Sequence, residues 1–128
     1  MLKKVSDLIG AELDYAVAKC EGATNLRENP HRFDKRLIFR LAERTVFMND
    51  FRFSTDWAQG GPIIERENIV LNPQYPSWAT TMRHAVSAPN TLSLIYSGPT
   101  PLISAMRCYV ASKLGATVEI PDEIGAKQ

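Results

Sequence analysis

The most unusual chemistry in this sequence lies in residues 54–67, which read STDWAQGGPIIERE. The glycine pair Gly60-Gly61 can adopt positive φ angles before Pro62 fixes the backbone, which is typical of a tight turn. Such a turn presents consecutive amides as an anion-binding nest, with Trp57 beside it as a stacking surface. Because the segment lacks the lysine of a phosphate-binding loop, we favour a structural turn in which Trp57 packs as an anchor.

Carboxylates in the same segment allow an enzymatic interpretation. Asp56, Glu65 and Glu67 could together hold a metal ion or act as acid and base. The structural alternative, which we favour, makes Ser54 or Asp56 the cap of a turn and places both glutamates on the solvated side of a strand. A cysteine nucleophile is disfavoured because Cys108 lies in a predicted helix, away from its N-terminus, where a thiol is usually core filler. We therefore predict no catalytic residue, metal ion or cofactor.

A second set of residues suited to binding lies in residues 27–52, which contain seven Lys or Arg against four Asp or Glu. All five phenylalanines of the chain lie in or next to this stretch. Cations bind phosphates and aromatic faces stack on bases, so Arg36, Arg40 and Arg44 are candidate contacts for single-stranded nucleic acid. Core phenylalanines and arginines on the solvated face of a strand would give the same pattern. Nucleic-acid binding is therefore an alternative function, not the leading one.

Two helices are expected to flank these segments. The first covers residues 7–20 and has Gly10 in its interior, where we expect the close approach of another segment. The second covers residues 101–114, with Thr100 as its N-cap and Gly115 as its stop. Apolar residues recur at helical spacing in both ranges.

Between the helices the sequence favours β-structure. Residues 67–72 and 77–85 are predicted to form short strands, and residues 91–96 a return strand that completes a hairpin with the second of them. Residues 24–53 are ambiguous, because their apolar residues fit a helix or two paired strands. We favour strands, since valine, threonine and phenylalanine dominate the second half of that range.

Length and composition bound the class of molecule. A chain of 128 residues, 45% hydrophobic and 23% charged, fits one globular domain over residues 1–128. We expect an α+β fold in which a small antiparallel sheet packs against an N-terminal and a C-terminal helix, followed by a flexible tail over 122–128. No stretch has the pattern of a signal peptide or a membrane span, and two distant cysteines do not make a disulfide scaffold. We therefore expect a cytoplasmic protein that does not bind membranes.

Four blocks of the sequence together resemble a known family. The blocks SDLIGAELDYAVAKCEG, STDWAQGGPIIERE, GPTPLISAMRCYVASKLG and VEIP are similar to the NinX-like proteins of lambdoid phages and enterobacterial prophages. They extend over roughly half of the chain, far more than a short motif, whereas residues 24–53 do not align. The resemblance implies an early phage accessory protein, encoded near recombination and replication functions and expressed in the bacterial cytoplasm. It implies no activity, cofactor or catalytic residue.

The leading hypothesis is a non-catalytic accessory protein that binds a host or phage protein. Its expected contact surface has Trp57 as the anchor, because a tryptophan on a rigid turn is a common hot spot. The other members of this surface are Asp56, Gln59, Gly60 and Gly61. The alternatives are a nucleic-acid-binding protein of phage recombination or replication that uses the three arginines, and a small hydrolase-like enzyme that uses the carboxylates.

Overall fold

The structure is a computed structural model that describes residues 1–30, 36–73, 78–85 and 91–126. Over those ranges the chain is α+β, as the sequence predicts, and its strands form three small antiparallel sheets. One sheet pairs β1 (Leu2–Lys4) with β8 (Thr117–Glu119). The second has the order β2 (Thr24–Glu28), β3 (Leu37–Leu41), β4 (Arg44–Phe47), and the third β5 (Val70–Pro73), β6 (Trp78–Ala85), β7 (Thr91–Gly98).

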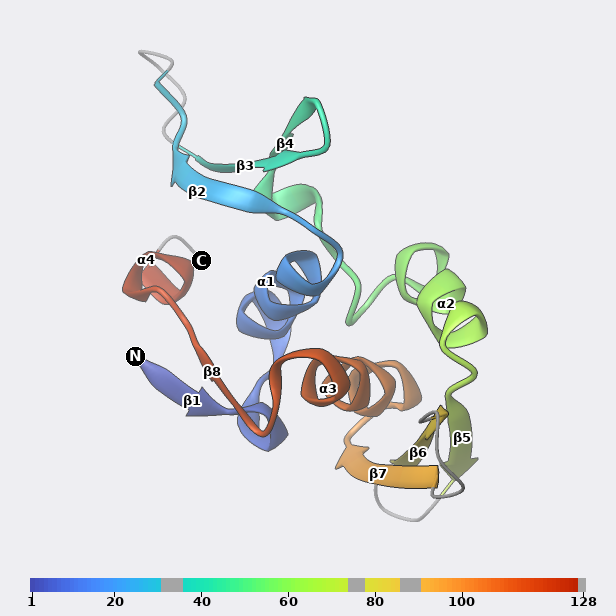
Figure 1. Ribbon diagram of the computed structural model, residues 1–128. Coiled ribbons are helices and arrows are strands. Elements are labelled where there is room, and N and C mark those ends of the chain that lie inside the picture. Colours follow the sequence, from blue (N-terminus) through green and yellow to red (C-terminus); the bar gives the residue numbers. More distant parts are fainter. Residues whose placement is uncertain (31–35, 74–77, 86–90, 127–128) are drawn as a thin grey trace.

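The described helices are α1 (Gly10–Cys20), α2 (Trp57–Arg66), α3 (Pro101–Leu114) and α4 (Asp122–Ala126). Of these, α1 and α3 form the centre of the molecule. In Figure 1, α1 and α3 lie side by side, with the β2–β3–β4 sheet beyond α1 and the β5–β6–β7 sheet against α3. The helix α2 packs beside α3, and α4 packs beside α1. Every residue of α3 from Leu102 to Ala111 is buried, as expected for a helix that is enclosed on nearly all sides.

The boundaries of α3 are those that its sequence predicts. Thr100 Oγ1 accepts a hydrogen bond from the amide of Ile103 at 3.1 Å, and Pro101 occupies the first turn, where its missing donor does no harm. Gly115 follows the helix with a φ of +92°, a conformation that strains other residues. Both signals are local, which is why the sequence alone places this helix.

The start of α1 differs from the prediction, since the helix begins at Gly10 and not at residue 7. Residues Val5–Asp7 form a 3-10 turn, η1, because Val5 and Leu8 enter the core, where both are fully buried. Gly10 has a φ of +60°, so its backbone conformation explains the glycine. The predicted close approach at Gly10 is wrong, because a Cβ there would meet no atom within 4 Å.

The described part of residues 24–53 contains the strands β2, β3 and β4, as favoured from its composition. The strands β3 and β4 pair from Ile38 opposite Phe47 to Leu41 opposite Arg44, which makes a tight hairpin. The predicted second hairpin is also present, as β6 paired with β7. The residues that connect β6 with β7 lie outside the described ranges.

The glycine turn predicted around residue 60 is wrong, because this segment forms α2. Asp56 is the N-cap of the helix, and its Oδ1 accepts a hydrogen bond from the amide of Ala58 at 2.9 Å. The helix continues to Arg66, so β5 begins at Val70 and not at residue 67. The capping role predicted for Asp56 is confirmed, although the capped element is a helix.

Packing explains why Gly60 is tolerated inside α2. A Cβ on Gly60 would lie 2.5 Å from Leu102 Cδ1 and 2.5 Å from the carbonyl oxygen of Phe53. Only glycine lets α2 approach α3 and the preceding segment this closely. Tertiary contact therefore outweighs the low helix propensity of Gly60, which the sequence pattern alone could not show.

The C-terminal segment is more ordered than predicted. The sequence predicts a flexible tail over residues 122–128, but Asp122–Ala126 form α4. Ile124 is fully buried in the same hydrophobic core as the central helices. One apolar side chain, placed one turn after Pro121, is enough to hold this short helix against α1.

Candidate functional site at the junction of the central helices

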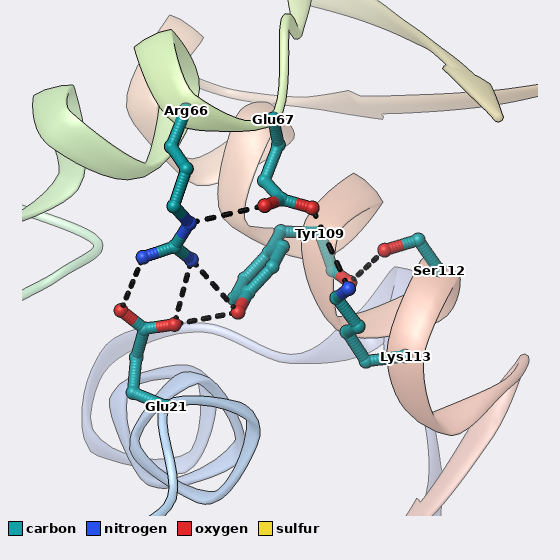
Figure 2. Close-up of polar contacts among 6 residues, drawn as sticks. All are labelled: Glu21, Arg66, Glu67, Tyr109, Ser112 and Lys113. Carbon is teal, nitrogen blue, oxygen red and sulfur yellow. Dashed lines mark hydrogen bonds and ion pairs between the residues drawn. The ribbon is translucent and has the colours of Figure 1, made fainter. Parts of the chain in front are cut away.

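A charged side chain at the end of α2 joins α1, α2 and α3, as Figure 2 shows. The Arg66 guanidinium donates from Nη1 and Nη2 to the two carboxylate oxygens of Glu21, at 3.1 and 2.8 Å. Glu21 directly follows α1, and Arg66 is the last residue of α2. Two parallel hydrogen bonds fix the plane of the guanidinium as well as its position.

Tyr109 of α3 completes this contact. Its Oη donates to Glu21 Oε2 at 2.5 Å and accepts from Arg66 Nη2 at 3.0 Å. Burial raises the pKa of Tyr109, and its hydrogen bond to Glu21 raises it further. Burial alone would raise the pKa of Glu21, but the hydrogen bonds from Arg66 and Tyr109 outweigh burial and lower it. The carboxylate is thus held in its ionised form and the phenol in its protonated form.

Two further charged side chains, Glu67 and Lys113, extend this contact. Arg66 Nε donates to Glu67 Oε2 at 3.0 Å, and Lys113 Nζ lies 3.6 Å from Glu67 Oε1. We call Glu21, Arg66, Glu67, Tyr109 and Lys113 the clasp (Figure 2). Each charge in the clasp faces an opposite charge, so the arrangement is suited to holding the three helices together and not to acid–base chemistry.

A cavity of about 570 Å³ lies at the opposite end of α1. It is lined on the α1 side by Gly10, Ala11 and Asp14, and on the other side by Asn49, Arg52 and Thr55. Asp14 is only 6% exposed, and its Oδ1 accepts a hydrogen bond from the amide of Ser54 at 2.8 Å. Burial raises the pKa of Asp14, an effect that the nearby Ser54 partly offsets. The cavity thus contains a carboxyl group in an environment that penalises its charge.

Of the predicted contact residues at the start of α2, Gln59 has a structural role. Its Oε1 accepts from the amide of Arg52 and its Nε2 donates to the carbonyl oxygen of Asp50, both at 2.8 Å. Together with the N-cap Asp56, these bonds fix the first turn of α2 to the segment before it. The side chains of Asp56 and Gln59 are therefore already engaged in hydrogen bonds within the domain.

The remaining members of that set differ in exposure. Gly60 is buried, Gly61 is partly exposed, and Trp57 is 51% exposed at the first position of α2. The large exposed ring of Trp57 contrasts with the packed anchor that the sequence suggested. Among the predicted contact residues of α2, Trp57 thus presents the largest apolar surface to solvent.

The three predicted arginines lie exposed on or beside the β3–β4 hairpin. Arg36 stacks its guanidinium 3.9 Å from the centre of the Phe47 ring. Arg40 Nε donates to the carbonyl oxygen of Ala42 at 3.3 Å, which is a weak local contact. The structure therefore places Arg36, Arg40 and Arg44 within one hairpin region.

Most of the described phenylalanines do not accompany these arginines to the surface. Phe39, Phe51 and Phe53 are buried and pack on one another, with ring centres 5.8 and 5.4 Å apart. Phe47 is half-buried beneath Arg36, and Phe33 lies outside the described residues. The aromatic surface that a single-strand binder would need is therefore mainly hydrophobic core.

The carboxylates proposed as an acid–base group do not converge. Asp56 precedes α2, whereas Glu65 lies near its other end, and nine helical positions correspond to about 14 Å. Glu67 belongs to the clasp. Throughout the described ranges, no group of three or more His, Cys, Asp or Glu could hold a metal ion.

The sequence did not single out Asp14, Glu21, Arg66 or Tyr109 as site residues. The clasp joins positions 45 and 88 residues apart, and no periodic pattern reports such pairs. A usable signal was present in the resemblance, because Glu21, Arg66 and Tyr109 come from its first three long blocks.

Comparisons with known proteins agree with the resemblance. The family model described as Bacteriophage P22, NinX matches residues 4–113, which confirms the predicted family. The match includes residues 24–53, the range that did not align with the family by its sequence blocks. No curated protein matches the chain. Within the described ranges, none of the helices has the length and apolar character needed to span a bilayer.

Proposed function

Because the chain belongs to the bacteriophage P22 NinX family, we propose that it is a non-catalytic phage accessory protein that binds a host or phage protein through the start of α2. The observation that carries this proposal is Trp57, which is 51% exposed at the first position of that helix. Tryptophan is strongly enriched among the residues that dominate protein–protein affinity, because its large ring buries much apolar area.

The rigidity of the helix start supports this role for Trp57. The Asp56 cap, the two Gln59 hydrogen bonds and the close packing of Gly60 hold the first turn of α2 in place. A ring presented on a fixed backbone loses less conformational entropy on binding than one on a mobile loop. The same contacts explain why polar and glycine residues surround the tryptophan.

Other features support a phage protein that acts in the host cytoplasm. Cys20 is a free thiol in the fold. Burial raises the pKa of Cys20 to about 12, so its reactive thiolate form is disfavoured. A reduced thiol of low reactivity suits a reducing compartment.

The experiment is an affinity purification of the tagged full chain from phage-infected cells, with one half of each sample treated with nuclease. We expect a protein that remains after nuclease treatment and that rebinds when both proteins are purified. Trp57→Ala should weaken this binding at least tenfold, the scale of a hot-spot residue. Ile95→Ala, at a residue that is 68% exposed on β7, is the matched control and should bind normally.

Two outcomes would contradict the proposal. A folded Trp57→Ala variant that binds every purified partner as the wild type does would remove α2 as the contact surface. Nucleic acid that co-purifies with the chain, and is lost when Arg40 and Arg44 are both replaced by Gln, would assign the function to the β3–β4 hairpin instead.

A further inference from the structure

The cavity at the N-terminal end of α1 exposes hydrogen-bond donors of the backbone. The N-cap residue is Ile9, whose apolar side chain accepts no hydrogen bond, so the amides of the first turn have no side-chain cap. Gly10 and Ala11 line the cavity, and Gly10 has no Cβ to cover these amides. Uncapped amides at the positive end of a helix dipole favour an anionic group.

A second and independent feature of the cavity is a buried acceptor. Asp14 is more than nine-tenths buried and yet lines the cavity. Its Oδ1 accepts a hydrogen bond from the Ser54 amide, but no cation in the described part of the chain forms an ion pair with this carboxylate. A buried carboxylate without a counter-charge is costly, so a cation that enters from the cavity would be stabilised there.

The opposite wall of the cavity carries a positive charge. Arg52 lines the cavity and is exposed. Its backbone amide is bonded to Gln59, but its guanidinium makes no hydrogen bond or ion pair with the part of the chain that the structure describes. One cavity therefore presents a carboxylate and helix amides on the α1 side, and a guanidinium on the other side.

From this arrangement we propose that the cavity binds a small zwitterion, a free α-amino acid, with its ammonium group on Asp14 and its carboxylate on Arg52 and the first-turn amides of α1. The ammonium supplies the counter-charge that the Asp14 carboxylate lacks, Arg52 supplies the counter-charge for the ligand's carboxylate, and both contacts are charge-assisted hydrogen bonds. A volume of about 570 Å³ lies within the range of small-molecule sites. The proposal does not depend on the protein contact at Trp57, because the residues that carry it precede α2.

The test uses the full chain, labelled with nitrogen-15, and the standard L-amino acids as probes at millimolar concentration. We expect at least one of them to shift the amide signals of Gly10, Ala11, Asn49 and Thr55 in a saturable way. The N-acetyl and the amide derivative of that amino acid should each bind about tenfold more weakly or worse, because each lacks one of the two charges.

Variants locate the site. Asp14→Asn removes only the charge, since its amide oxygen can still accept the Ser54 hydrogen bond, and Arg52→Gln removes the opposite charge from an exposed position. Both should weaken binding about tenfold or more. Arg44→Gln, at an exposed arginine on β4, is the matched control and should leave the affinity unchanged. Arg52→Gln also keeps the test decisive if Asp14→Asn does not fold.

The proposal is overturned if no amino acid gives saturable shifts, or if both cavity variants bind the amino acid as the wild type does. It is also overturned if acetate or ethylamine alone matches the affinity of the amino acid, because the cavity would then recognise a single charge. Ordered water would then be the occupant that solvates Asp14. Loss of the protein partner in Trp57→Ala leaves these outcomes unchanged, so the two proposals fail separately.

Discussion

Removal of one hydroxyl group from the clasp should measurably destabilise the domain. The ring of Tyr109 is almost completely buried, so Tyr109→Phe fills the same volume and deletes only Oη. This atom bonds to Glu21 Oε2 at 2.5 Å and to Arg66 Nη2 at 3.0 Å. Hydrogen bonds to charged groups contribute about 1.5–3 kcal/mol each in favourable cases.

The expected cost lies at the low end of that range. The Glu21 side chain is 21% exposed and keeps both hydrogen bonds from Arg66, so water can replace part of what the phenol supplied. Half of the Arg66 side chain is exposed, which screens its charge further. We therefore expect a loss of about 1.5 kcal/mol in the free energy of unfolding, or about 5 °C in the melting temperature.

Urea unfolding followed by circular dichroism gives the free energy directly. The matched control is Tyr15→Phe, because Tyr15 is buried too but its hydroxyl makes no hydrogen bond with the residues that the structure describes. This control should change stability by less than about 0.5 kcal/mol. Equal effects of the two substitutions would refute the assignment of stability to the clasp.

The pH dependence gives a second check with a definite sign. The pKa of Glu21 in the folded chain is lower than its ordinary value of 4.5, so the folded state favours the ionised carboxylate. The contribution of the clasp is then complete above about pH 4.5 and is lost as pH falls through the lower, folded pKa. The difference between wild type and Tyr109→Phe should shrink in that acidic window, and a difference that does not change with pH would show that Glu21 is not the partner.

Four further substitutions test helix packing and one buried charge by the same unfolding measurement. Gly60→Ala would place a Cβ 2.5 Å from a leucine carbon and from a backbone oxygen, and should lower the free energy of unfolding by about 1–3 kcal/mol. The matched control, Gly61→Ala, meets nothing closer than 4.0 Å and should raise the free energy of unfolding by up to about 1 kcal/mol. Ile124→Ala should cost about 2–5 kcal/mol if α4 belongs to the core, and a negligible cost would restore the flexible tail. The pKa of Asp14 is raised in the folded chain, so its charged form opposes folding at any pH above the unfolded pKa. Asp14→Asn should therefore be at least as stable as wild type at pH 7. This advantage should vanish below about pH 3.8, where the unfolded chain is protonated too.

Local signals predicted the elements whose determinants lie next to each other in the chain. The Thr100 cap and the Gly115 stop placed α3, and the residue types of residues 24–53 favoured the strands that are present. The family was also identified from the sequence, because long blocks carry more information than short motifs.

Predictions failed where distant residues decide the local structure. Gly60 and Gly61 were assigned to a turn on the basis of propensity, but the contact of Gly60 with Leu102 makes glycine necessary within a helix. Val5 and Leu8 moved the start of α1 because both enter a core built from the far end of the chain. The clasp was missed for the same reason, since its partners meet only after the three helices have packed.

The structure also separates residues that the fold requires from residues that it does not explain. Glu21, Arg66 and Tyr109 hold three helices together, and Gly60 permits the close approach of α2, so their presence needs no ligand or partner. The same cannot be said of the Trp57 ring, the Arg52 guanidinium or the buried charge of Asp14, for which the described chain provides no comparable partner. Arg52 and Trp57 lie within a few positions of each other, and Asp14 is tied to Ser54 between them. Function should therefore be sought where the segment before α2 meets the first turns of α1, and not at the clasp.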